Sequence, residues 1–379
     1  MVLLSGTVEP GFEKVREAFE ANFDLHGDVG AAVTVYRHGR IVVDLWGGER
    51  NASTGEPWEA DTLVRVASTT KGITAICANL LAQQGKLDFD EPAATYWPEF
   101  AAEGKGSIPV RWLISHQAGL PVVDRLFTKE DVFAVEPIAE ALAVQRPIWE
   151  PGTAHGYHGQ TYGYLVGEII RRISGRTVGR FLADEVAGPL ALDTFIGLPT
   201  EMLSRTAQVI SPAYGTAASS SAPAAPDVDA EEMAFRLRVF LFTHLRPDYN
   251  SPEWLQIEMP SANAVTSARS LAKLYASLIG EVDGVRLFTQ ETLDAARTCL
   301  TDGEDRVLRR HTRYGLGFAL ASSHMPSISP GTFGHPGAGG SVGLADPETG
   351  VAMAYVMNAH KMADDPRAGN LAEAVRNSL

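Results

Sequence analysis

Hydrophobic residues near the start of the chain follow first a helical and then a β-strand pattern. Apolar positions at steps of three and four predict an amphipathic helix over residues 11–23. Two runs rich in Val, Ala and aromatic residues, 30–36 and 41–46, are joined by a short segment that contains glycine, which predicts a β-hairpin. A third short strand at residues 63–67 leads directly into a helix that should continue to about residue 84.

The middle of the chain has mainly helical patterns, and strand patterns return near the C-terminal end. The predicted helices of the middle region include residues 164–174, 178–186 and 264–279. The predicted late elements are strands at residues 315–321, 332–333, 341–345 and 351–357 and a helix from about residue 368. Residues 212–226, rich in Ala, Ser and Pro, predict a flexible surface loop.

This distribution predicts an α+β fold, an antiparallel sheet flanked by helices with a helical domain inserted into it. Strands open and close the chain with a helical block between them, so one sheet formed from both ends is the simplest arrangement. We expect a sheet lobe formed by residues 1–72 and 285–379 and a helical lobe with loop insertions formed by residues 73–284.

Composition narrows the class of protein. The 379 residues are 45% hydrophobic and 21% charged, which is typical of a globular chain and excludes a disordered or fibrous one. The net charge of −14 disfavours nucleic acid or an anionic membrane as a partner. No apolar stretch reaches the roughly 18 residues that cross a bilayer, and the first residues lack the pattern of a secretion signal. We therefore expect no membrane span and a cytoplasmic location; no pattern indicates an oligomeric state.

An S-x-x-K sequence places a serine and a lysine one helical turn apart at the predicted strand-to-helix junction. Ser68 and Lys71 would share one face of the helix, whose positive end stabilises an oxyanion and disfavours an ammonium. A neutral lysine there can take the proton of the serine, which makes Ser68 a candidate nucleophile. Ser270 and Lys273 have the same spacing but lie inside an amphipathic helix pattern, where neither residue needs a catalytic function.

Two competing interpretations of the serines remain. Ser68 could simply cap the helix, as serine often does at such junctions. Ser341 lies in a G-G-S-V-G sequence that fits the G-x-S-x-G pattern of another hydrolase class. That pattern requires a helix directly after the serine, whereas strands follow Ser341, so we expect a glycine-rich turn instead.

The chain resembles the superfamily of serine β-lactamases and penicillin-binding proteins, in particular its class C-like members. The resemblance covers about residues 30–360 and rests on four motifs that occur in the family's order. These are S-T-T-K at 68–71, L-I-S-H-Q-A-G-L-P at 113–121, W-E-P-G-T at 149–153 followed by Tyr157, and F-G-H-P-G-A-G-G at 333–340. The implied fold is that of β-lactamases and transpeptidases, with the active site between the two lobes.

The resemblance also implies roles for particular residues. Tyr157 would work with Lys71 as the base that takes and returns the proton of Ser68. The backbone N–H groups of Ser68 and Ala338 would form the oxyanion hole; Pro336 cannot contribute because it has no N–H. Substrate-binding positions would be His335, which stands where the family has the lysine of K-T-G, together with Gly337, His158 and Gln117.

Neither a metal nor another cofactor is expected. His116, His155 and His158 lie near these motifs, but their spacing matches no metal motif and no carboxylate is at ligand spacing. The two cysteines, Cys77 and Cys299, are too few for a thiolate zinc site or a disulfide framework.

Two departures from the lactamase pattern point to esters. The common Y-x-N is Tyr157-His158-Gly159 here, so the amide that would hold a lactam side chain is absent. His335 in place of lysine removes the permanent cation that would pair with a lactam carboxylate. Both features are similar to the family VIII carboxylesterases, which have a β-lactamase fold, and imply a serine hydrolase that cleaves small to medium carboxylic esters.

Alternatives share part of this chemistry. An acyltransferase or transesterase, an amidase and a weak β-lactamase would all use the same acyl-serine, because water and other nucleophiles approach it alike. A non-catalytic binding module with the same fold is disfavoured, since it would have no need of Ser68, Lys71 and Tyr157 together.

Overall fold

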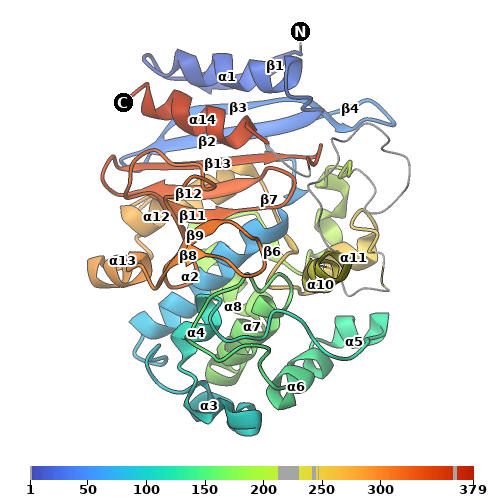
Figure 1. Ribbon diagram of the computed structural model, residues 1–379. Coiled ribbons are helices and arrows are strands. Elements are labelled where there is room, and N and C mark those ends of the chain that lie inside the picture. The colour runs from blue at the N-terminus through green and yellow to red at the C-terminus, as the bar shows by residue number, and fades with distance from the viewer. Residues whose placement is uncertain (1, 212–229, 241–244, 246, 362–364) are drawn as a thin grey trace.

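An antiparallel sheet assembled from both ends of the chain forms the centre of the upper part of the molecule (Figure 1). The computed structural model describes residues 2–211, 230–240, 245, 247–361 and 365–379. The sheet has ten strands, in the order β1-β3-β2-β13-β12-β11-β10-β9-β8 with β4 paired to β3. The strands are β1 (Leu4–Val8), β2 (Gly30–Arg37), β3 (Arg40–Asn51), β4 (Glu56–Pro57), β8 (Thr301–Glu304), β9 (His311–Tyr314), β10 (Ala319–Leu320), β11 (Phe333–Pro336), β12 (Val342–Asp346) and β13 (Val351–Met357).

Strand β13 joins the N-terminal strands to the C-terminal ones and is buried on both faces. It pairs with β2 from Val351↔Arg37 to Met357↔Ala31 and with β12 on its other side. Its sequence V-A-M-A-Y-V-M is apolar throughout, as expected for a strand covered on both faces. Alternate residues enter different cores: Val351, Met353 and Tyr355 face one cluster, and Ala352 and Ala354 face the other.

Helices cover the two faces of this sheet. On one face α1 (Glu13–Asp24) and α14 (Arg367–Arg376) pack against each other (Figure 1). On the other face α12 (Ala268–Ile279) packs against β2, β12 and β13. Its residues belong to the segment 73–284 that was predicted to form the helical lobe. Helix α2 (Thr70–Gln83) lies between the sheet and the remaining helices and is buried over most of its length.

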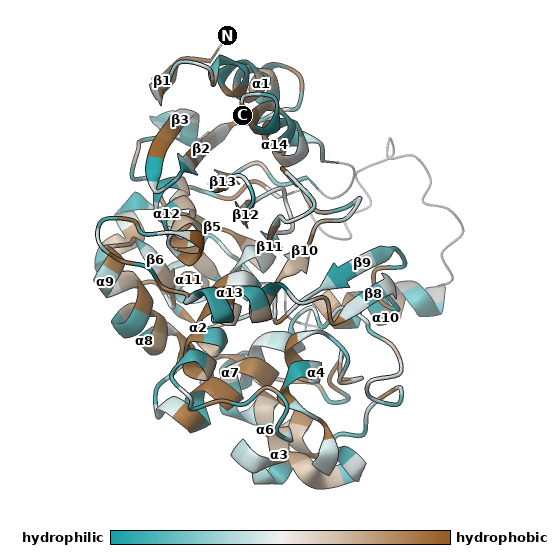
Figure 2. Ribbon diagram, turned by 90° about the vertical axis from the view of Figure 1, so that its left-hand side faces the viewer, coloured by the Kyte–Doolittle hydropathy of each residue, from teal (hydrophilic) through white to brown (hydrophobic). Residues whose placement is uncertain are grey.

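The remaining helices lie mainly below the sheet, where Figure 2 shows hydrophobic residues along α2, α7 and α8. They are α3 (Ala93–Tyr96), α4 (Val110–Ile114), α5 (Lys129–Ala134), α6 (Glu136–Val144), α7 (Thr161–Ser174), α8 (Val178–Leu182), α9 (Gly188–Leu190), α10 (Ala230–Phe240), α11 (Pro252–Gln256) and α13 (Gln290–Arg297). Short 3₁₀ segments occur at Ala67–Thr69, Pro98–Ser107 and Thr200–Arg205, and a π turn occurs at Ala183–Ala187. Within the described part of the chain, every helix is too short or too polar to cross a membrane.

A second, three-stranded sheet corrects the predicted organisation of the middle region. Its order is β5 (Val64–Arg65), β7 (Ala264–Thr266) and β6 (Thr194–Ile196). The predicted strand at 63–67 is thus only two residues long and does not join the main sheet. The helix predicted from residue 264 begins at Ala268, because its first residues form β7.

Other predicted elements agree to within a few residues or are shortened. Strand β13 has the predicted bounds, whereas the strand predicted at 315–321 is reduced to Ala319–Leu320. Strands β8 and β9 were not predicted, because their polar sequences T-D-G-E and H-T-R-Y lack an alternating pattern. The predicted loop at 212–226 lies outside the described residues. The antiparallel sheet flanked by helices confirms the α+β prediction.

Candidate active site

A sharp turn places Ser68 between the end of β5 and the start of α2. Ala67, just before it, has φ of +44°, a backbone conformation that L-residues rarely adopt. The Thr70 hydroxyl donates to Ala67 O at 2.5 Å, and the Thr69 N–H donates to Val66 O at 3.1 Å. These bonds hold the strained turn, and Ser68 remains partly exposed at its tip.

Lys71, one turn along α2, is fully buried and has three oxygen atoms around its amine. Nζ lies 2.7 Å from Gly159 O, 2.8 Å from Ser261 O and 3.3 Å from Ser68 Oγ. Burial, and secondarily the charge of Arg65, hold the pKa of the Lys71 amine well below its usual range. A neutral amine has two N–H groups for the two carbonyls and one lone pair. That lone pair is left for the Ser68 hydroxyl.

Tyr157 packs over the same amine. Its ring centroid lies 4.8 Å from Lys71 Nζ, and its ring contacts His116 and Phe240 at centroid distances of 4.9 and 6.0 Å. Burial raises the pKa of the Tyr157 phenol, and its hydrogen bond with the Ser68 side chain opposes that shift. At neutral pH the phenol is therefore protonated, which suits it to carry a proton rather than to act as a phenolate.

The turn between β11 and β12 approaches the Ser68 turn so closely that only glycine fits at position 337. A Cβ on Gly337 would lie 2.3 Å from Val66 O and 2.3 Å from Ser341 Oγ. The Ser341 hydroxyl donates to Val66 O at 2.9 Å and so joins the two turns. Ser341 is 2% exposed and lies at the end of the glycine-rich turn that its sequence predicts, so its hydroxyl is structural.

The two predicted oxyanion donors flank this junction. Ala338 is exposed and directly follows Gly337. Across residues 2–211, 230–240, 245, 247–361 and 365–379, the backbone N–H groups of Ser68 and Ala338 donate no hydrogen bond. Both donors are therefore free to bind an oxygen atom.

A buried arginine from the C-terminal helix holds the far side of the same turn. Arg367 Nη2 donates to Gly339 O at 2.7 Å, and its side chain is fully buried. Asp28 and Asp365 pair with its guanidinium. The position of the Ala338 N–H thus depends on a charge cluster that includes both end regions of the chain.

Comparison with known proteins agrees with this arrangement. The family model described as Beta-lactamase matches residues 15–377. Esterase/beta-lactamase LipL of Mycobacterium tuberculosis is 36% identical over 361 residues, which cover 93% of this chain and 82% of that protein. The chain belongs to the β-lactamase family.

Two solved structures of the family share the whole fold. One, described as a family VIII carboxylesterase, has a TM-score of 0.89 and 34% identity, with 100% of both chains covered. A penicillin-binding protein homologue from Caulobacter crescentus has a TM-score of 0.88 and 35% identity, also with 100% of both chains covered. These matches confirm the resemblance that the four motifs predicted.

His335, at the K-T-G position of the β-lactamase family, is an uncharged side chain here. Its Nδ1–H donates to Pro336 O at 2.8 Å, because a carbonyl can only accept. Burial and the neighbouring Lys71 lower the pKa of His335 to about 3. The remaining atom, Nε2, is a buried acceptor without a partner among the described residues. The structure therefore places no cation at this position.

Two other predicted substrate-binding side chains form hydrogen bonds within the protein. His158 is fully buried, donates from Nδ1 to Gly156 O at 2.7 Å and accepts at Nε2 from the Leu120 N–H at 3.0 Å. Neither of its ring nitrogens is free for a substrate. Gln117 Nε2 donates to Ser115 Oγ at 2.8 Å, and the Gln117 side chain is 9% exposed.

The histidine cluster forms part of the packing around Tyr157. His116 Nδ1 accepts from the His158 backbone N–H at 3.1 Å, and His155 Nε2 lies 2.8 Å from Thr312 Oγ1. Burial lowers the pKa of each of these three histidines. Among the residues that the structure describes, no three His, Cys, Asp or Glu side chains are grouped so that they could hold a metal ion.

Three contributors to the site were missed because they carry no recognisable motif. Gly159 and Ser261 act through their backbone carbonyls, which any residue possesses. Asp305 directly follows Glu304 between two polar strands and has no motif to distinguish it, yet its Oδ1 accepts the backbone N–H of Tyr157 at 3.0 Å. The Thr74 hydroxyl donates to Pro260 O at 2.6 Å and so holds the segment next to Ser261 against α2. This contact can be recognised only once the fold is known.

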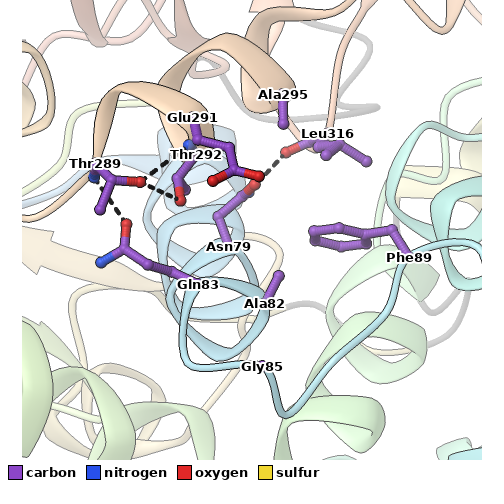
Figure 3. A pocket seen from close by; sticks show the side chains of 10 residues that line it. All are labelled: Asn79, Ala82, Gln83, Gly85, Phe89, Thr289, Glu291, Thr292, Ala295 and Leu316. Atoms are coloured by element: carbon purple, nitrogen blue, oxygen red, sulfur yellow. Dashed lines mark hydrogen bonds between the residues drawn. The ribbon is translucent and has the colours of Figure 1, made fainter.

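A cavity of about 350 Å³ lies at the opposite end of α2 from Ser68 (Figure 3). Polar side chains that line it form hydrogen bonds within the protein: Asn79 donates to Leu316 O at 3.1 Å, and Gln83 accepts from the Thr289 N–H at 2.8 Å. None of the predicted catalytic residues lines it.

Proposed function

We propose that this protein is a serine hydrolase that cleaves small to medium carboxylic esters through an acyl-serine intermediate. The observation that carries the proposal is the buried Lys71 amine, whose two carbonyl partners leave its lone pair for the hydroxyl of Ser68 at 3.3 Å. A nucleophile beside a neutral base is the arrangement that acyl transfer requires.

In the first half-reaction Ser68 Oγ attacks the ester carbonyl carbon while its proton passes to Lys71 Nζ. The carbonyl oxygen becomes an oxyanion held by the N–H groups of Ser68 and Ala338. As the C–O bond breaks, the Tyr157 O–H donates a proton to the departing alcohol and regains one from Lys71. In the second half-reaction, water attacks the acyl-serine by the same route in reverse, which releases the acid and restores Ser68.

The reaction would take place between the two predicted lobes. Ser68, Lys71 and Ala338 belong to residues 1–72 and 285–379, whereas Tyr157 and the carbonyls of Gly159 and Ser261 belong to residues 73–284. Because each lobe supplies part of the base, neither would catalyse the reaction alone.

Uncharged esters are the favoured substrate class. His335 is neutral and so offers no cation for a substrate carboxylate. The names of relatives point the same way: LipL is called an esterase/beta-lactamase, and one structural neighbour is called a family VIII carboxylesterase. We place acyl transfer to other acceptors and lactam cleavage second, because no described contact favours an amine, an alcohol or a carboxylate.

Hydrolysis of p-nitrophenyl butyrate by the wild type and by Ser68→Ala tests the proposal. We expect the variant to lose the activity by a factor of about 10⁴ or more. Ser270→Ala is the matched control, since Ser270 also begins an S-x-x-K but lies in α12, where its hydroxyl accepts the Asp193 N–H at 3.0 Å. Unchanged activity in Ser68→Ala, or no activity in the wild type, would overturn the proposal.

A further inference from the structure

A single buried carboxylate lies behind the candidate catalytic tyrosine. Asp305 follows β8 and is 0% exposed. Its Oδ1 accepts three backbone N–H groups: that of Tyr157 at 3.0 Å, that of Val307 at 2.8 Å and that of Leu308 at 2.8 Å. Its Oδ2 lies 3.5 Å from the Thr312 hydroxyl.

Two of these three bonds lie within the loop that contains Asp305, and the third joins this loop to Tyr157. The Asp305 N–H donates to Arg310 O at 2.9 Å and the Arg309 N–H donates to Asp305 O at 2.9 Å, so the loop closes on its own backbone. The bond to Tyr157 joins residues 148 positions apart in the sequence.

A second set of contacts ties the same loop to His155. The Arg306 N–H donates to His155 O at 3.0 Å, and the His155 ring reaches Thr312 Oγ1 at 2.8 Å. The loop therefore holds the chain two residues before Tyr157 as well as at Tyr157.

The segment that carries Tyr157 needs such support. Residues 151–160 form no helix or strand, and α7 begins only at Thr161. A buried N–H outside regular structure must find an acceptor elsewhere, and a carboxylate provides a charge-assisted, shorter and stronger bond than a carbonyl does.

We propose that Asp305 is a positioning residue for the reaction: by accepting the Tyr157 N–H, its carboxylate sets where the phenol stands relative to Ser68 and Lys71. This inference rests on the proposed function, since it assigns Tyr157 a place in proton transfer. Asp305 touches neither substrate nor the reacting atoms, and it acts only through the backbone of the tyrosine.

The alternative role is that Asp305 serves only to fold its own loop. In that case its replacement would lower the amount of folded protein but leave the rate per intact active site unchanged. If Tyr157 instead moves away from its catalytic position, kcat falls with little change in KM. Displacement of a reacting group by about 1 Å reduces the rate by about 100-fold.

Two substitutions separate these roles. Asp305→Asn retains an Oδ1 that can accept all three N–H groups, and its Nδ2 can donate to Thr312 Oγ1 once the Thr312 hydroxyl turns toward His155. Asp305→Ala removes every acceptor. We expect kcat, counted per active site by burst titration with p-nitrophenyl acetate, to fall about 100-fold in Asp305→Ala and to stay within about 10-fold of wild type in Asp305→Asn.

Asp346 supplies a matched control. It is also 0% exposed, and it accepts from the Thr332 hydroxyl at 2.6 Å and the Thr349 N–H at 3.0 Å at the end of β12, with no bond to a candidate catalytic residue. Asp346→Ala should lower stability and leave kcat per active site unchanged. Equal losses of kcat in Asp305→Ala and Asp346→Ala, or in Asp305→Ala and Asp305→Asn, would overturn the proposal, as would wild-type kcat in Asp305→Ala.

Asp305→Glu keeps the test decisive if Asp305→Ala does not fold. It retains the charge but moves the acceptor by one methylene, so we expect kcat to fall by about 10-fold or more. Crystal structures of the Glu variant and the wild type give a readout independent of turnover: the Tyr157 ring should move from its 4.8 Å separation from Lys71 Nζ. An unmoved ring would overturn the proposal even if the wild type failed to cleave esters and the proposed function were lost.

Discussion

The two sides of the candidate active site are each held from behind by a buried charge of opposite sign. On the base side the Asp305 carboxylate accepts the N–H of Tyr157 at 3.0 Å. On the oxyanion side the Arg367 guanidinium donates to Gly339 O at 2.7 Å, one residue after Ala338.

The two supports differ in how far they reach through the chain. The other partners of Asp305 Oδ1 belong to its own loop, whereas Arg367 pairs with Asp28 near one end of the chain and Asp365 near the other. Asp28 in turn accepts from the Tyr355 hydroxyl on β13 at 2.6 Å. Loss of the Asp305 carboxylate should therefore reduce the rate more than the stability, whereas loss of the Arg367 guanidinium should reduce both.

Replacement of the base should give the largest loss of rate. Lys71→Met removes the lone pair that faces Ser68, and we expect kcat to fall by about 10⁴-fold. The free energy of unfolding should also fall, because the buried carbonyls of Gly159 and Ser261 lose their N–H donors, at a cost of about 1 kcal/mol or more each.

Lys105→Met is the matched control: Lys105 is equally buried and donates to Ala102 O and Gln145 O, but away from the site. Comparable losses of ester hydrolysis in both variants would contradict the assignment of Lys71.

Displacement of the oxyanion turn should be the next largest effect. Gly337→Ala would bring a Cβ to 2.3 Å from Val66 O, so the turn must move and carry the Ala338 N–H with it. Loss of one oxyanion donor lowers kcat by about 10²–10³-fold. Gly369→Ala in α14 is the control, since its Cβ would meet nothing within 4 Å. Wild-type kcat in Gly337→Ala would show that Ala338 does not bind the oxyanion.

Removal of Arg367 should affect stability and rate together. Arg367→Met leaves the Asp28 carboxylate buried without its partner, which should lower the free energy of unfolding by about 3–5 kcal/mol. Urea unfolding measures that loss, and kcat per folded molecule should fall by about 10-fold as the Gly339 turn loosens. Arg376→Met, on the exposed side of the same helix, should change neither. A stability loss with unchanged kcat would separate the charge cluster from the oxyanion hole.

The smallest expected effect is on the pH dependence of stability. It involves His360, whose ring lies against Gly339 in the oxyanion turn. Burial lowers the pKa of His360 to about 3, below the ~6.5 of an unfolded histidine. Between these values the unfolded chain binds a proton that the folded chain does not, so stability falls as the pH decreases from about 6.5 toward 3.

The slope is at most about 1.4 kcal/mol per pH unit for each such histidine. We expect His360→Gln to remove one histidine's share of this slope while keeping stability at pH 7. His158→Gln, on the base side, should differ from His360→Gln by losing stability at pH 7, because both ring nitrogens of His158 are hydrogen-bonded. Urea unfolding at pH 7 and pH 5 measures both effects; an unchanged slope in His360→Gln would contradict the first.

The sequence predicted those parts of the site that lie on one element or one motif. Ser68 and Lys71 are a helical turn apart, so local geometry alone brings them together. Strand β13 was predicted with correct bounds because it is apolar throughout. The short strands β6 and β7 were missed because three residues show no period.

What could not be predicted depends on pairing between distant segments. The carbonyls of Gly159 and Ser261 carry no side-chain signal, and Asp305 is one of many acidic residues until the fold brings its loop under Tyr157. His158 shows the opposite limit: its position beside Tyr157 in the sequence suggested a substrate contact, but nothing in the sequence indicates that both of its ring nitrogens form hydrogen bonds within the protein.

The central place of β13 has a consequence for how the chain is made. Strands β2 and β3 leave the ribosome early, but the partner of β2 on its other side is not translated until residues 351–357. Throughout synthesis of the intervening helices, the nascent protein therefore exposes an unpaired strand edge, which is a site for aggregation. Chaperones that bind emerging chains should act on this protein through β2, and premature termination before β13 should yield an insoluble product.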